Sequence, residues 1–207
     1  MRKMMSLIDR SLLYEFYSDL FIYKWDEEEY SSFVQRVKDV DSTYTNLRPL
    51  TSKILNASRK DLLVEYSSLF LTGTGSRPLT PVESKRIFSI MGEKIALSKY
   101  KDLLSFYDSW GLKPKSVGNF FQPEADHISS ILAFMAFLIS KENETTAEGR
   151  KPLRSMSDQK LFFFNHVLSW IPSWANDVIK DKRSNLFGVA CSSLNQWIEQ
   201  EKIRLGL

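Results

Sequence analysis

The sequence has 207 residues, 43% of them hydrophobic and 13% aromatic, which is enough for one domain with a substantial core and excludes a disordered chain. Its 28 basic and 25 acidic residues are scattered and leave a net charge of +3, so nucleic-acid binding is permitted but not indicated. One cysteine, Cys191, excludes an internal disulfide framework, and no apolar run is long enough for a signal peptide or a membrane span, so we expect a cytoplasmic protein.

Apolar residues three and four positions apart, bounded by helix caps, predict helices along almost the whole chain. The first is expected to follow Ser6, with Asp9 as a weak capping partner, and to end near Trp25. Asp26 then caps a second helix. Residues 41–57 are less regular, with a break and a short helix.

Ser58 is expected to cap the next helix, which ends in a loop rich in glycine and proline at 71–81. Thr80-Pro81 predicts the start of another helix, and a further one is expected from near Ser98 to Trp110. Residues 111–122 form a second irregular connection.

A long apolar helix is expected to begin at Pro123, because proline is tolerated in the first helical turn. In this reading Glu124 and Asp126 face the positive end of the helix dipole and His127 lies in the same turn. The core of the protein is expected to be built on this helix.

The remaining chain begins with a polar segment, 141–153, which predicts an exposed loop. A helix capped at Ser155 or Ser157 follows, and Pro172 interrupts it, either as a groove-shaping kink or as a plain turn between helices. A last amphipathic helix is expected from Asn185 to Ile203. The pattern predicts an all-α fold, a single compact bundle over 1–207. As an alternative, the bundle could divide into two loosely distinct lobes, about 1–110 and 123–207, which residues 111–122 would connect.

No residue pattern indicates catalysis. Two histidines far apart and one cysteine in an apolar helical face do not make a standard zinc site. The loop at Gly73 follows no strand and lacks the residues of a phosphate-binding loop. Asp126-His127 is a pair without a third catalytic partner, and a helix-start carboxylate beside a solvent-facing histidine explains it as well. We therefore predict that the protein is not an enzyme.

Three different motifs nevertheless occur one after another between about positions 60 and 200. The first comprises Glu65-Tyr66-Ser67-Ser68-Leu69-Phe70, Gly73, Pro78 and Pro81-Val82-Glu83-Ser84. The second comprises Pro123, Asp126, His127, Ile128, Leu132, Phe134, Met135 and Leu138. The third comprises Phe163, His166, Trp170, Pro172, Trp174 and Asp177. Together they resemble the TorD/DmsD/NarJ family of redox-enzyme maturation chaperones.

The resemblance implies a cytoplasmic, TorD-like chaperone whose partner is the apo-form of a molybdopterin oxidoreductase catalytic subunit, its N-terminal twin-arginine leader peptide, or both. It would assist cofactor insertion and proofread before export. A NarJ-like chaperone for a subunit that is not exported remains an alternative, and a small nucleotide-dependent enzyme using Asp126 and His127 is a more distant one. The resemblance further implies no resident cofactor, with weak guanine-nucleotide binding, and a monomer or homodimer.

The expected client-binding residues come from the first two motifs. Three of them are expected to line an apolar groove that accepts a leader helix, and carboxylates beside it are expected to pair with leader arginines. The set is Tyr66, Leu69, Phe70, Pro81, Glu83, Ser84, Pro123, Glu124, Asp126 and His127.

Overall fold

The computed structural model describes residues 5–24, 26–73, 75–112 and 123–207, and over these ranges it contains helices and no strand. The α-helices are α1 (Leu7–Leu20), α2 (Glu27–Thr43), α3 (Arg48–Asn56), α4 (Arg59–Tyr66), α5 (Glu83–Met91), α6 (Glu93–Ser109), α7 (Ile128–Ala147), α8 (Leu153–Phe162), α9 (Ile171–Lys180) and α10 (Leu186–Arg204). A 3₁₀ turn, η1 (Thr45–Leu47), precedes α3, and two π-helical segments, η2 (Ser67–Leu71) and η3 (Phe163–Leu168), extend α4 and α8. The prediction of an all-α bundle is confirmed.

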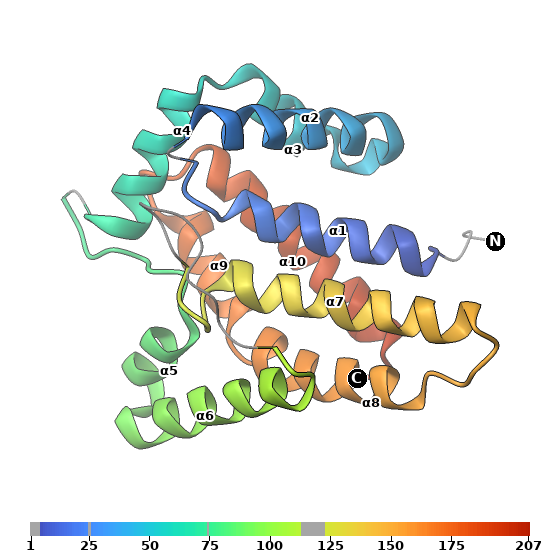
Figure 1. Cartoon of the computed structure of the whole chain (residues 1–207). Coiled ribbons are helices and arrows are strands. Elements are labelled where there is room, and N and C mark those ends of the chain that lie inside the picture. The colour runs from blue at the N-terminus through green and yellow to red at the C-terminus, as the bar shows by residue number, and fades with distance from the viewer. Residues whose placement is uncertain (1–4, 25, 74, 113–122) are drawn as a thin grey trace.

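The pair of helices α1 and α7 forms the centre of the bundle (Figure 1). Small side chains let the two helices approach closely. The Ser18 hydroxyl donates to the Ser129 carbonyl over 2.8 Å, and the Ser11 hydroxyl donates to the Ala136 carbonyl over 3.2 Å. Leu132 and Met135 on α7 are fully buried. As predicted, the core is built on this long apolar helix.

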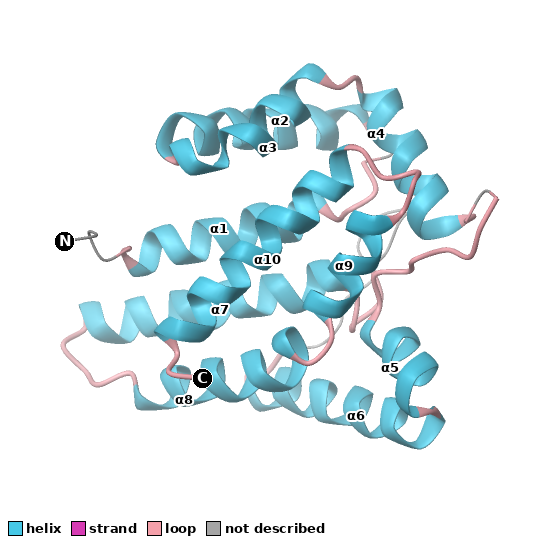
Figure 2. Ribbon diagram, turned by 180° about the vertical axis from the view of Figure 1, so that it is seen from behind, coloured by secondary structure: helices cyan, strands magenta, loops and turns pink. Residues whose placement is uncertain are grey.

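The other helices cover this pair. In Figure 1, α2 and α3 lie on one side of α1, while α5, α6 and α8 lie on the opposite side, beyond α7. Figure 2 shows α9 and α10 crossing the reverse face. One cluster of buried apolar residues contains members from both halves of the sequence. The division into two lobes stays a prediction, and most of its proposed connection, 113–122, lies outside the described residues.

Capping residues set several helix starts as predicted. Ser6 and Ser58 each form a reciprocal capping box, with Asp9 and Asp61 respectively, and the Asp26 carboxylate accepts from two N–H groups of α2. Glu65, the first residue of the first motif, has an unexpected capping role. Its carboxylate accepts from the N–H groups of residues 185–187 at the start of α10, over 2.7–3.0 Å. The motif therefore fastens α4 to α10.

Other predicted boundaries are wrong. Helix α1 ends at Leu20, several residues before Trp25, which lies outside the described residues. Helix α6 begins at Glu93, not near Ser98, because Gly92 with its positive φ of 86° turns the chain directly after α5. Helix α8 begins at Leu153, earlier than either predicted cap.

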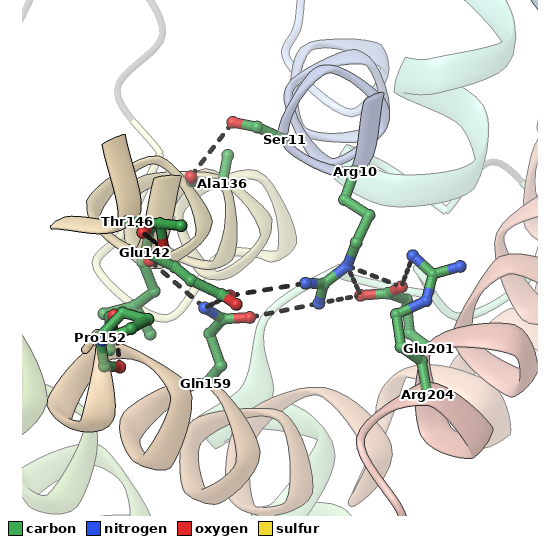
Figure 3. A network of polar contacts seen from close by, with 11 residues as sticks. Arg10, Ser11, Ala136, Glu142, Thr146, Pro152, Gln159, Glu201 and Arg204 are labelled. Carbon is green, nitrogen blue, oxygen red and sulfur yellow. Dashed lines mark hydrogen bonds and ion pairs between the residues drawn. The ribbon is translucent and has the colours of Figure 1, made fainter. Parts of the chain in front are cut away.

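The polar segment 141–153 is only partly a loop, because α7 continues to Ala147. The reason is a buried network at its end (Figure 3). The Arg10 guanidinium donates to Glu201 over 2.8 Å and to Gln159 over 3.2 Å. The Gln159 amide in turn donates to Glu142 on α7 over 2.8 Å. This network joins α1, α7, α8 and α10, so the start of a mostly polar segment is packed through polar contacts.

The loop after η2 depends on glycine. Gly73 has φ of 58°, in the left-handed region, and a Cβ there would collide with the backbone of Ser76 and with Pro78. The predicted break in the third motif is also clear. Trp170 ends the turn after η3, and Pro172 lies in the first turn of α9, so the segment is a plain turn between two helices.

Candidate functional site

The three motifs meet at residues 79–84. Residues 79–82 of this segment are extended, and Val82 forms an antiparallel bridge with His127. The Ile128 N–H donates to the Pro81 carbonyl over 2.9 Å, and the Glu83 N–H donates to the Asp126 carbonyl over 3.0 Å. This pairing explains why α5 begins at Glu83 and not at Pro81, as was predicted.

Asp126 serves a different helix from the one predicted. Its carboxylate accepts from the Ser84 N–H over 2.8 Å, in the first turn of α5. Residues 123–126 precede α7, which begins at Ile128, so the prediction that Pro123 opens that helix is wrong. Asp126 is buried and caps α5, because a carboxylate is favoured at the N-terminus of a helix.

His127 is the N-cap of α7, with ring Nδ1 accepting from the Ser129 N–H over 3.2 Å. The other ring nitrogen lies 3.5 Å from the hydroxyl of Tyr66 in the first motif. The residue is buried, so the solvent-facing interpretation is wrong. Burial, with a smaller contribution from the charge on Lys85, lowers the pKa of His127 to about 3.

The depressed pKa of His127 makes stability depend on pH. The unfolded chain takes up a proton near pH 6.5, whereas the folded ring stays neutral down to about pH 3. The free energy of unfolding should therefore fall as the pH drops, by about 1.4 kcal/mol per unit from this residue in the interval between those values. Urea unfolding at pH 7 and pH 5 should show a smaller difference in His127→Asn, which keeps a capping side chain. Equal pH dependence in the two proteins would contradict this assignment.

A second buried histidine joins the first and third motifs. His166 Nδ1 lies 2.9 Å from the Glu83 carboxylate, and Nε2 lies 3.1 Å from the Asp102 carboxylate on α6. Burial raises the pKa of the Glu83 carboxyl, and the hydrogen bond with His166 opposes that shift. His166 thus fastens both helices of the α5–α6 hairpin to η3.

The predicted apolar groove is not formed by the residues assigned to it. Tyr66, Leu69 and Phe70 are fully buried. The ring of Tyr66 packs against Phe187, and the ring of Phe70 packs against both Phe21 and Phe187. The prediction that these residues line an open groove is wrong, because their apolar face turns inward. Glu83 is also buried and engaged by His166, so it does not face solvent as a free partner for arginine.

An open cavity of about 930 Å³ lies on the outer side of the same segment. Apolar side chains from five segments form part of its lining. They are Leu79, Phe88, Ala96, Leu97, Ala125 and Trp174, with Tyr100 beside them. Of the predicted site residues, Ser84, Glu124 and Asp126 reach this cavity. Phe88 and Leu97 are 57% and 52% exposed, an unusual state for large apolar side chains on facing helices.

Ion pairs border the cavity. Lys85 pairs with Glu124 at 2.8 Å, and Arg86 pairs with Asp177 of the third motif at 2.7 Å. The Trp174 indole N–H donates to the Leu79 carbonyl over 2.9 Å and holds the extended segment in place. Lys85, Arg86 and Glu124 thus place charged groups among the side chains that line the cavity.

Sequence reasoning missed Phe88 and Leu97. A signal was present, because α5 and the start of α6 carry more large apolar residues than one inward face can hold. The exposed ones are Phe88, Ile90, Met91, Ile95 and Leu97. The ion pair between Arg86 and Asp177 could not be predicted, because the two residues are far apart in the sequence.

The described residues contain no group of His, Cys, Asp and Glu side chains suited to holding a metal ion. Cys191 is buried, as predicted, and burial raises the pKa of its thiol. Within the same ranges, no helix combines the length and apolar character needed to cross a bilayer.

A protein-family model described as nitrate reductase delta subunit matches residues 37–176. Among solved structures, the chain is similar to a crystal structure described as a candidate redox enzyme maturation protein from Archaeoglobus fulgidus. The two share 18% sequence identity, the alignment covers 91% of this chain and 93% of that one, and the TM-score is 0.58. At this identity the similarity shows a common fold. No curated protein matches the sequence.

Proposed function

Because this chain belongs to the nitrate reductase delta subunit family, we propose that it is a maturation chaperone for a molybdenum-containing redox enzyme. The family assignment agrees with the resemblance carried by the three motifs. The observation that supports a binding role is the open cavity, whose apolar lining includes Phe88, Leu97 and Trp174. It lies where the three motifs converge.

The proposed ligand is a segment of the client subunit, either its N-terminal leader or another part of the apo-form. A helix with one apolar face would place that face on the apolar lining of the cavity. Arginines of a leader could pair with Glu124 and Asp177 by exchanging partners with Lys85 and Arg86. In this proposal the buried residues Tyr66, Leu69, Phe70, Glu83 and His127 act indirectly, by holding the cavity's walls.

The proposal includes a cytoplasmic location, no resident cofactor and no catalytic activity of its own. Purifying the protein from its native cells and identifying the co-purifying polypeptide by mass spectrometry would name the client. A client with a twin-arginine leader would favour proofreading before export, and a client without one would favour NarJ-like assembly. Calorimetric titration with the client's leader and, separately, with a guanine nucleotide would test both ligands. Binding to neither leader nor apo-subunit by the folded protein would refute the proposed function.

The double substitution Phe88→Ser/Leu97→Ser should weaken client-peptide binding at least tenfold, because it removes apolar surface from the cavity. The thermal midpoint should change little, since both side chains are more than half exposed in the free protein. Val64→Ser, which alters an equally exposed residue on α4, is the matched control for calorimetry. Unchanged affinity in the double variant would place the client elsewhere.

A further inference from the structure

A second exposed apolar surface lies along α8 and the start of η3. Leu153, Met156, Leu161 and Phe164 are each between 50% and 70% exposed. Their spacing puts them on one side of the helix, while the neighbouring Phe162 and Phe163 are fully buried. We call these four residues the α8 ridge. None of them lines the cavity proposed for the client.

The charges along the α8 ridge are mostly of one sign. The exposed charged residues between positions 149 and 164 are Arg150, Lys151, Arg154 and Lys160. The segment has one carboxylate, Asp158, and it is partly buried and accepts from the Trp110 indole N–H over 2.9 Å. Arg150 pairs with Glu148 just before this segment, and Arg154 pairs with Asp158 at 3.7 Å and lies over the Trp110 ring. Lys151 and Lys160 are therefore the basic residues of the segment that form no ion pair with the described residues.

The position of α8 leaves this ridge accessible. Helix α8 lies at the lower edge of the molecule in both overall views, beside the C-terminal end of the chain (Figures 1 and 2). Lys160 donates to the Gly206 carbonyl over 3.2 Å, and the four apolar side chains of the ridge stay at least half exposed beside this contact.

Charge decides between the possible occupants. A second copy of the chain would bring the same basic residues against themselves, and a leader peptide rich in arginine would be repelled. A surface that carries phosphates would attract the basic residues and accept the apolar side chains between its headgroups.

We propose that the α8 ridge binds the surface of anionic phospholipid membranes. Leu153, Met156, Leu161 and Phe164 enter the interfacial region, and Lys151, Arg154 and Lys160 lie near lipid phosphates. The contact is peripheral and reversible, because four side chains bury far less apolar surface than a membrane-spanning helix. It is separate from client binding and would bring the protein to the membrane with its cavity free.

Flotation of the purified protein with phosphatidylglycerol-containing vesicles and with pure phosphatidylcholine vesicles tests this proposal. We expect binding to the anionic vesicles alone, weakened by added salt. Lys151→Gln/Lys160→Gln should lower the partition coefficient by about fivefold for each charge removed. Leu153→Ser/Phe164→Ser should lower it at least tenfold. All four sites are exposed, so the thermal midpoint of each variant should match the parent.

The matched control is Phe88→Ser/Leu97→Ser, which should float with anionic vesicles like the parent because it alters only the client cavity. The proposal is overturned if the protein ignores anionic vesicles, or if the α8 variants bind them unchanged. It is equally overturned if the α8 variants lose affinity for a purified acidic client subunit while the parent never floats. A failure here leaves the calorimetric test of client binding unaffected.

Discussion

Replacing His166 by alanine should destabilise the protein by about 3–5 kcal/mol, because it removes the buried imidazole that contacts the carboxyl groups of Glu83 and Asp102. Glu83 would keep a fully buried carboxyl without its hydrogen bond, and Asp102 would lose its contact with η3. The cavity left among the rings of Phe106 and Phe162 adds to the loss. Urea unfolding followed by circular dichroism measures the change.

The neighbouring variant Asn165→Ala is the control for His166→Ala. Asn165 takes part in the structure through its backbone carbonyl, which accepts from Lys99 over 2.7 Å and survives the substitution. It should lose less than about 1 kcal/mol. If His166→Ala proves as stable as this control, then His166 does not fasten the α5–α6 hairpin in solution.

Arg10→Met should also cost about 3–5 kcal/mol, since it leaves the Glu201 carboxylate buried without its main partner. Glu201 is completely buried, and its other ion pair, with Arg204 at 3.3 Å, is partly open to water. Gln159 and Glu142 would lose their link to α1 as well (Figure 3). Chemical denaturation of the variant gives the free energy of unfolding.

Two comparisons sharpen the Arg10 experiment. Lys202→Met breaks a pair at 3.6 Å on the exposed side of the same helix, α10, and should cost at most about 1 kcal/mol. Arg10→Met/Glu201→Leu removes both buried charges, and it should recover much of the stability lost in Arg10→Met. A double variant no more stable than the single one would mean that packing, not the uncompensated charge, causes the loss.

The helical class, most elements and the dominant core helix followed from the sequence, because apolar spacing and local caps act within a few residues. Ser6 with Asp9 and Ser58 with Asp61 form their capping boxes as expected. The misplaced starts of α5 and α7 have a non-local cause. Val82 pairs with His127 in an antiparallel bridge and the Asp126 carboxylate accepts from the Ser84 N–H, contacts that no short window of sequence contains.

The residues assigned to the candidate site do not lie in the structure as the sequence suggested. The motifs do converge, yet Tyr66 and Phe70 turned out to be buried. The spacing of apolar residues in a helix is the same whether they face the core or an open cavity. The pattern alone therefore could not show that Phe70 is buried and Phe88 is exposed. The burial of His127 and His166 likewise depends on helices that are distant in the sequence.

The pairing of α1 with α7 has a consequence for how this protein is made. The Ser11 hydroxyl meets a carbonyl 125 positions later, and Arg10 meets a carboxylate 191 positions later. During synthesis the apolar face of α1 must therefore wait for most of the chain before it finds its partner, which slows folding and exposes the nascent protein to aggregation. A protein proposed to bind an incompletely assembled client thus exposes the apolar face of its own central helix while it is being synthesised.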